Sequence, residues 1–145
     1  MPSQPKSLRL NIKPLGASYS RYNGGWWPRS RNLAVELPVV LHVLAARLGV
    51  IRRVGYNPGT WGWMSRLMTV DGYVVQLAGF PSLDAYSLRI TSTSPDVFCL
   101  LVVPPDADEF AGDAALTAAT VQNGHSRDVL AACGALPGAA AAWRP

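Results

Sequence analysis

The sequence predicts an α+β fold, in which a mostly antiparallel sheet of five or six strands carries one main helix after its first strand and one or two C-terminal helices packed on one face. Two patterns support this prediction. Short runs of alternating apolar and polar residues, bounded by Gly, Pro, Asn and Asp, are typical of half-buried strands. Apolar residues at intervals of three and four in one long segment are typical of an amphipathic helix. Because most strands follow one another without a helix between them, we expect antiparallel neighbours.

The strands are expected wherever alternation or a short apolar run lies between turn residues. They are Leu8–Lys13, Val50–Tyr56, Arg66–Val70, Tyr73–Leu77, Ser87–Ser92 and Val97–Val103. Asp71 and Gly72 separate two of these runs, and this dipeptide favours a tight hairpin with a type I′ turn. The last run is apolar throughout, which places it at the centre of the sheet. Residues 57 to 60 are interpreted as a turn.

The main helix is expected from about Asn32 to Leu48, with Ser30 as its N-cap. Pro38 removes a backbone donor inside it, so we expect a kink or a restart near Leu37. Two helices follow the last strand. They are Glu109 to Val121, capped by Asp106 or Asp108, and a shorter helix from Ser126 through Cys133.

The 145 residues are enough for one core, and we expect a single domain at 8–134 between a flexible tail at 1–7 and an Ala/Pro-rich flexible tail at 135–145. No apolar run has the length of a transmembrane helix, and the first residues lack the apolar stretch of a secretory signal. A cytoplasmic location is therefore expected. Cys99 and Cys133 fit that location, because two cysteines at this spacing form neither a zinc site nor a disulfide framework.

Charge is divided unevenly along the chain. Residues 1–66 hold ten Lys or Arg and one acid, a net of +9, whereas residues 67–145 hold three arginines and eight acids, a net of −5. One interpretation is a basic face that meets phosphate or another polyanion. The alternative is that the two halves pack together and their charges compensate across the surface.

The segment Gly24–Arg31 is the first candidate binding site. It places Trp26 and Trp27 next to Arg29 and Arg31. Aromatic faces stack on bases and guanidinium groups pair with phosphate, so this segment could contact a nucleotide, a nucleic acid or a phosphorylated metabolite. Alternatively, the indoles close one end of the core and the arginines pair with acids such as Asp106 or Asp108.

A second group follows the second expected strand and contains Tyr56, Asn57, Trp61 and Trp63. These residues could line the same cleft as the first group, with Asn57 as a polar contact for a ligand. Alternatively, Asn57 begins a simple turn and the tryptophans cover an edge of the core. Both interpretations stay open at this point.

No sequence motif for a cofactor or a metal is present, so neither is expected, and no catalytic residue is assigned. His42 lies on the flank of the main helix's apolar stripe and is interpreted as a packing residue rather than a general base. Four acids near the start of the later helix could gather a divalent ion, but helix capping explains them more simply. They are Asp106, Asp108, Glu109 and Asp113.

Several short runs together resemble one known family. They are Trp26–Leu33, Glu36–Pro38, Tyr56–Pro58 followed by Trp61, Val70–Gly72 and Leu100–Asp106. With these runs, residues Leu8 to Leu130 are similar to a family of small actinobacterial proteins classed as a domain of unknown function. The resemblance implies a single intracellular domain and no established activity. Members of that family usually have Asp where this chain has Asn32, so a carboxylate that could pair with an arginine or act as a base is missing here.

Three hypotheses about function follow. The first is a non-enzymatic binding or regulatory domain whose Arg/Trp surface contacts an anionic partner. The second is an enzyme for a small metabolite, in which Arg29 or Arg31 clamps the substrate. The third is a subunit that docks a protein partner through its Trp-rich end. The sequence predicts neither the ligand nor the oligomeric state.

Overall fold

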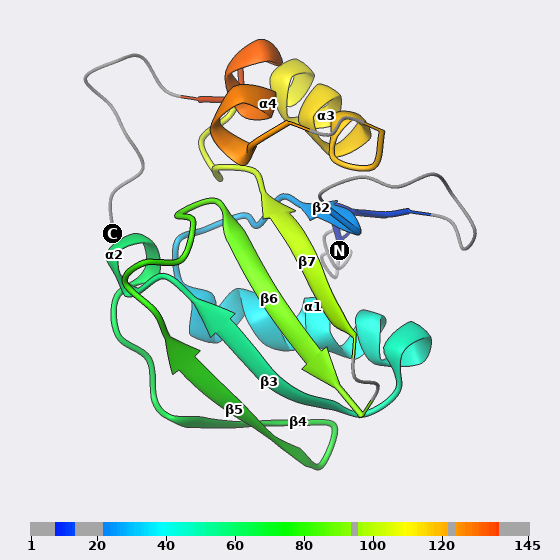
Figure 1. The fold of residues 1–145 in the computed structure, drawn as a ribbon, viewed down its shortest axis with the longest axis vertical. Helices are drawn as coiled ribbons and strands as arrows, with labels where there is room; N and C mark the ends of the chain where they lie inside the picture. Colours follow the sequence, from blue (N-terminus) through cyan, green and yellow to red (C-terminus); the bar gives the residue numbers. More distant parts are fainter. Residues whose placement is uncertain (1–7, 14–21, 94–95, 122–123, 137–145) are drawn as a thin grey trace, which may run out of the picture.

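The computed structural model describes residues 8–13, 22–93, 96–121 and 124–136 (Figure 1). Its strands form one sheet of seven strands within these residues, in the order β1-β2-β7-β6-β3-β5-β4. The strands are β1 (Leu10–Ile12), β2 (Gly24–Trp26), β3 (Ile51–Tyr56), β4 (Leu67–Val70), β5 (Tyr73–Gly79), β6 (Ser87–Ser92) and β7 (Val97–Val102). The helices are α1 (Leu33–Leu48), α2 (Pro58–Trp61), α3 (Glu109–Ala118) and α4 (Ser126–Ala132).

The α+β class is confirmed, but the sheet is mixed and has more strands than predicted. β2 pairs with β7 in parallel, and β3 pairs with β5 in parallel, while the other neighbours are antiparallel. The sequence missed β2 because two of its three residues are glycines, which show no alternation. A Cβ atom at Gly24 would lie 2.5 Å from the carbonyl oxygen of Asn11, so the close approach of β1 excludes a side chain there.

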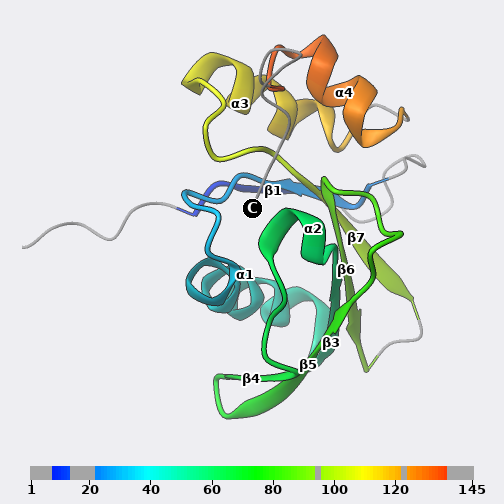
Figure 2. The same ribbon diagram turned by 90° about the vertical axis from the view of Figure 1, so that its left-hand side faces the viewer.

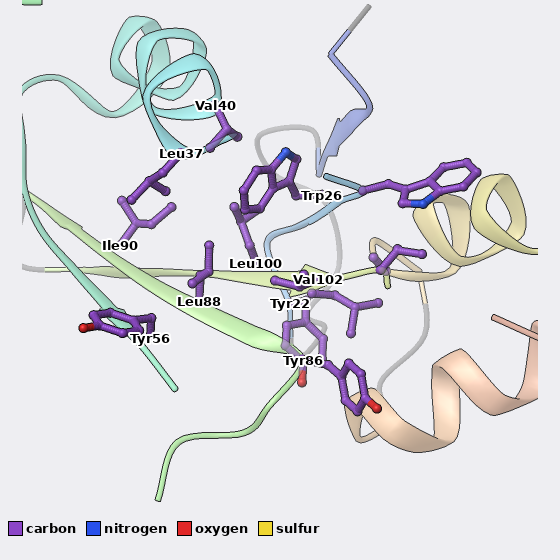
Figure 3. Close-up of a cluster of buried hydrophobic side chains, with 14 of the residues drawn as sticks. Tyr22, Trp26, Leu37, Val40, Tyr56, Tyr86, Leu88, Ile90, Leu100 and Val102 are labelled. Atoms are coloured by element: carbon purple, nitrogen blue, oxygen red, sulfur yellow. The ribbon is translucent and has the colours of Figure 1, made fainter. Parts of the chain in front are cut away.

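The helices lie on both faces of the sheet, and the prediction that they share one face is wrong. α1 and α2 cover one face, and α3 and α4 cover the β1-β2-β7 end of the other (Figure 2). Neighbouring residues of β2 face opposite sides. A Cβ at Gly25 would meet the side chain of Ala119 just after α3 at 2.8 Å, whereas Trp26 lies on the α1 side, near Val40 (Figure 3).

The main core lies between α1 and the sheet. Leu37 and Val40 of α1 face Leu88, Ile90 and Leu100 of the central strands, and all five side chains are buried (Figure 3). β7 lies between β2 and β6, which agrees with the prediction of a central position from its apolar run.

α1 is one continuous helix through Pro38, so the restart predicted near Leu37 is absent. The missing N–H of Pro38 leaves the carbonyl of Ala34 without its helical donor. Ala34 is exposed, so water can take that position and the helix continues. The N-cap is Asn32 rather than Ser30, and the side chain of Asn32 makes no capping hydrogen bond.

The predicted hairpin is confirmed. Asp71 and Gly72 both have positive φ, at 52° and 82°, as a type I′ turn requires. His42 lies on the exposed side of α1, and its Nδ1 lies 2.6 Å from the Asp71 carboxylate, so this contact joins the hairpin to α1. The turn predicted at 57 to 60 is a single turn of helix, α2.

The packed part of the chain extends slightly beyond the domain boundary predicted at 134. Ala135 is buried, and Leu136 packs against the core. The tail predicted at 1–7, and residues 137–145 of the tail predicted at 135–145, lie outside the described residues.

Candidate functional site

The structure brings one tryptophan from each predicted group together, but inside the protein. The rings of Trp26 and Trp61 stack with centroids 6.1 Å apart, and both side chains are buried. Tyr56 is buried as well, and its hydroxyl accepts a hydrogen bond from the backbone N–H of Met64 at 2.8 Å. These three aromatic residues therefore contribute core packing and have almost no surface to offer a ligand.

The side chain of Asn57 forms hydrogen bonds with nearby backbone groups. Its Oδ1 accepts from the N–H of Gly59 at 2.8 Å, and its Nδ2 donates to the carbonyl of Leu83 at 2.7 Å. The side chain thus caps α2 and holds the loop before β6 against it. Trp63, by contrast, is exposed, with one edge of its ring over Gly79.

Trp27 lies on the other side of the sheet, where only 3% of it is exposed. The guanidinium of Arg9 sits 3.7 Å above its ring, and a Cβ at Gly112 of α3 would lie 2.3 Å from its six-membered ring. Arg9 donates to the carbonyls of Trp27 and Pro28 at 3.1 and 3.0 Å. Burial and the nearby Arg29 lower the pKa of Arg9. Arg9 therefore fixes the Trp27 segment from β1, a role that the sequence interpretation did not assign.

The turn after Trp27 is held by Glu36, the only acid in the first 66 residues. Its carboxylate accepts from the backbone N–H of Arg29 at 3.1 Å and from the hydroxyl of Ser30 at 2.8 Å. Arg31 forms an ion pair with Asp106 at 3.4 Å. The alternative interpretation, in which an arginine of this segment pairs with an acid of the later half, is thus confirmed for Arg31.

A hollow of about 420 Å³ lies between this segment and α3. Its lining includes Arg9, Arg29 and the edge of Trp27 on one side, and Glu109 and Asp113 of α3 on the other. Two positive and two negative side chains leave its wall with no net charge. A strongly anionic partner would be repelled by the carboxylates as much as it is attracted by the guanidinium groups.

Half of the sheet's second face has no helix over it in the part of the chain that the structure describes. It is formed by β6, β3, β5 and β4, on the side opposite α1 (Figure 2). We call it the open sheet face. Arg53 of β3 is paired in register with Gln76 of β5 and with Thr91 of β6, and Arg89 is paired with Gly55. These residues therefore share the open sheet face.

The open sheet face is basic. A shallow hollow of about 500 Å³ on it is lined by Arg52, Arg53, Leu67, Val74, Gln76 and Thr91. The guanidinium of Arg53 donates to Oε1 of Gln76 at 3.2 and 3.0 Å, which holds it flat against the sheet. The strands β3 to β6 contain no Asp or Glu. Phe80, 44% exposed, adds an aromatic ring beside Gly55, where a Cβ would lie 3.3 Å from it.

The sequence alone did not reveal the open sheet face, because its arginines are far apart in the chain. The available signal was the placement of Arg53 and Arg89 at polar positions of two alternating strands that lack acids. Their proximity depends on the pairing of β3 with β6, which the sequence does not provide.

A polar cluster lies at the edge of the open sheet face, beneath α4. The hydroxyls of Tyr22 and Ser87 lie 3.1 Å apart, and Asp84 accepts from Ser126 at 2.5 Å and from Tyr22 at 3.4 Å. Ser126 is the first residue of α4, so these bonds attach that helix to the sheet. Cys99 lies nearby, and burial raises the pKa of its thiol, while Arg89 acts in the opposite direction.

Among the described residues, no three His, Cys, Asp or Glu side chains lie close enough to hold a metal ion. The same part of the chain has no helix with the length and apolar character needed to cross a bilayer.

Comparison with known proteins identifies a family but no function. No curated protein and no solved structure matches the chain. Residues 9–119 match the family described as "Family of unknown function (DUF5994)". This match covers most of the chain and confirms the resemblance to a family of unknown function. The protein therefore belongs to this family of unknown function.

Proposed function

We propose that this protein is a binding domain whose open sheet face holds an extended anionic partner, single-stranded nucleic acid in particular. The observation that carries the proposal is the presence of Arg52, Arg53 and Arg89 on or beside one uncovered sheet face whose strands contain no carboxylate. Asp84 shares a hollow with Arg89 at the edge of the face, whereas the hollow around Arg52 and Arg53 contains no acid. Positive charge without a nearby carboxylate attracts a phosphate backbone and releases its counterions.

The open sheet face also carries the kinds of side chain that bind single-stranded nucleic acid. Arg53 on β3 is opposite Thr91 on β6, and Arg89 lies two residues further along β6 on the same face. The two arginines are therefore diagonal neighbours, with Cα atoms about 7–8 Å apart, rather than isolated charges. Phe80 offers an exposed ring on which a base can stack. Gln76 and Thr91 add neutral hydrogen-bonding groups on either side of Arg53.

This proposal puts the anion-binding surface elsewhere than the segment Gly24–Arg31, which we call the Trp-Arg segment. Trp26 and Trp61 are covered, Arg31 faces Asp106, and the hollow beside Arg29 contains Glu109 and Asp113. The hypothesis of an enzyme with an arginine clamp at Arg29 meets the same two carboxylates, so the open sheet face is favoured for an anion.

The test is fluorescence anisotropy with a labelled single-stranded RNA or DNA at several salt concentrations. We expect affinity to fall as salt rises, with a slope on a logarithmic plot of about −0.7 for each phosphate contact. Arg53→Gln and Arg89→Gln should each weaken binding severalfold and reduce that slope.

Arg127→Gln is the matched control, because Arg127 is an exposed arginine on α4, outside the open sheet face. It should leave affinity and salt dependence unchanged. Absence of binding at low salt, or equal losses in the control and in the sheet variants, would contradict the proposal.

A further inference from the structure

The outer side of α1 is apolar, although it faces away from the core. Val35, Val39 and Val43 are 61%, 54% and 40% exposed, and their spacing of four residues places them in one line along the helix. The side of a surface helix that faces solvent is normally polar. Valine is also a weaker helix former than Ala, Glu or Lys, so helix propensity does not explain three of them there.

A second apolar surface lies beside the end of α1. Val50, which follows α1, is also partly exposed. It borders a groove of about 250 Å³ between α1 and the β4–β5 hairpin. The groove is lined almost entirely by apolar or aromatic side chains, including Ala45, Val70 and Tyr73, with Asp71 at the turn. The exposed His42, bonded to Asp71, lies between this groove and the valine row, so the two apolar surfaces are separate. The valine row is the exposed apolar surface that a contact with another protein would cover.

We propose that this surface is the contact of a homodimer in which the α1 helices of two copies pack antiparallel. A two-fold axis requires a surface that matches itself, and a straight row of equally spaced valines does so. Rows spaced by four residues also form the ridges that fit into the grooves of a second helix.

Charge favours the antiparallel arrangement. Glu36 and Arg47 lie on the same side of the valine row, near opposite ends of α1, because each residue advances about 100° around the helix. When Val39 packs against the partner's Val43, the same register aligns Glu36 with the partner's Arg47. A parallel pair would leave Glu36 eleven residues from the partner's Arg47 along the helix axis, so these two charges could not pair.

This inference does not depend on the proposed function. α1 and the open sheet face are on opposite sides of the sheet (Figure 2). A dimer through α1 therefore leaves both open sheet faces accessible, and failure of one proposal leaves the other standing.

The test is sedimentation velocity of the full chain from about 1 μM to about 1 mM, because contacts of limited area often have micromolar affinity. We expect dimer to increase with concentration. Val39→Asp should give a monomer with a nearly unchanged melting temperature, since Val39 is exposed in the protomer.

The control is Val74→Asp, since Val74 is 59% exposed but lies on the open sheet face. It should dimerise as the parent does. A parent chain that stays monomeric throughout, or a Val39→Asp variant that still dimerises, would overturn the proposal.

Cysteine cross-linking tests the orientation. Val39→Cys chains mixed with Val43→Cys chains should form a disulfide-linked dimer faster than either variant alone, because a disulfide needs Cα atoms within about 7 Å. The parent chain, with Cys99 and Cys133 only, is the background control. Equal or faster linkage of each variant with itself would rule out the antiparallel register.

Discussion

Replacing Gly112 by Ala tests how Trp27 is held between the sheet and α3. A glycine inside a helix normally costs about 0.5–1 kcal/mol relative to Ala, so this substitution would stabilise an ordinary helix. Here the new Cβ would lie 2.3 to 2.5 Å from three atoms of the Trp27 ring, closer than any real contact. The sign of the effect therefore depends on whether the ring can move.

The structure indicates that the ring of Trp27 cannot move freely. Arg9 covers the ring at 3.7 Å and is itself fixed by two backbone carbonyls. Overpacking of this kind costs about 1–3 kcal/mol. We take the upper part of that range because backbone-anchored groups lie on both sides of the ring. Subtracting the helix gain leaves a net loss of about 2 kcal/mol, or roughly 4–8 °C in melting temperature for a domain of this size.

The assay is urea unfolding of four chains: the parent, Gly112→Ala, Trp27→Leu and the double variant. Leu removes the ring, so Gly112→Ala should become neutral or stabilising by up to about 1 kcal/mol in that background. The two substitutions should therefore couple strongly. The reasoning is refuted if Gly112→Ala stabilises the parent, or if its effect is the same with and without the indole.

Three further predictions concern stability. Glu36→Ala should lower the free energy of unfolding by about 1–2 kcal/mol, because the hydroxyl of Ser30 and a backbone N–H lose their acceptor, and urea unfolding would reveal this. Gly72→Ala should cost about 1–2 kcal/mol in the same assay because its φ of 82° is unfavourable for a residue with a Cβ, and an unchanged midpoint would contradict the type I′ turn. Burial raises the pKa of both Cys99 and Cys133, so the folded state favours the protonated thiols. The stability that the two thiols contribute should be present below the ordinary thiol pKa and lost as pH rises above it. A Cys99→Ala variant should therefore lose less free energy of unfolding between pH 7 and 10 than the parent chain does.

The elements that the sequence predicted correctly depend on local signals. Asp71 and Gly72 specify their own turn, and Gly49 ends α1 with a φ of 82°. Asp108 caps α3 by accepting from the N–H of Ala111 at 2.7 Å, as one of the two predicted caps. Each of these features depends on residues within a few positions of one another, so the chain alone is sufficient to predict it.

The elements that the sequence missed depend on distant neighbours. β2 is a strand because β1 and β7 provide its hydrogen-bonding partners, and its two glycines are explained by Asn11 and by Ala119 on either side. The parallel pairing of β3 with β5 skips the intervening hairpin strand and has no local sequence signal. The direction in which Trp26 and Trp27 face follows from β2, so their burial could not be predicted without that strand.

The same dependence on distant neighbours applies to charge. The sequence shows that its two halves carry opposite net charge, but it predicts only in part where the charged side chains lie on the surface. Acids of the later half, Asp106, Glu109 and Asp113, do face the arginines of the Trp-Arg segment, as the compensating interpretation expects. Yet Arg53, from the basic half, shares the open sheet face with Arg89, from the acidic half. Net charge along the chain averages over this arrangement, whereas strand pairing determines it. A basic face can therefore arise in a sequence whose halves otherwise neutralise each other, and only the order of strands in the sheet indicates where that face lies.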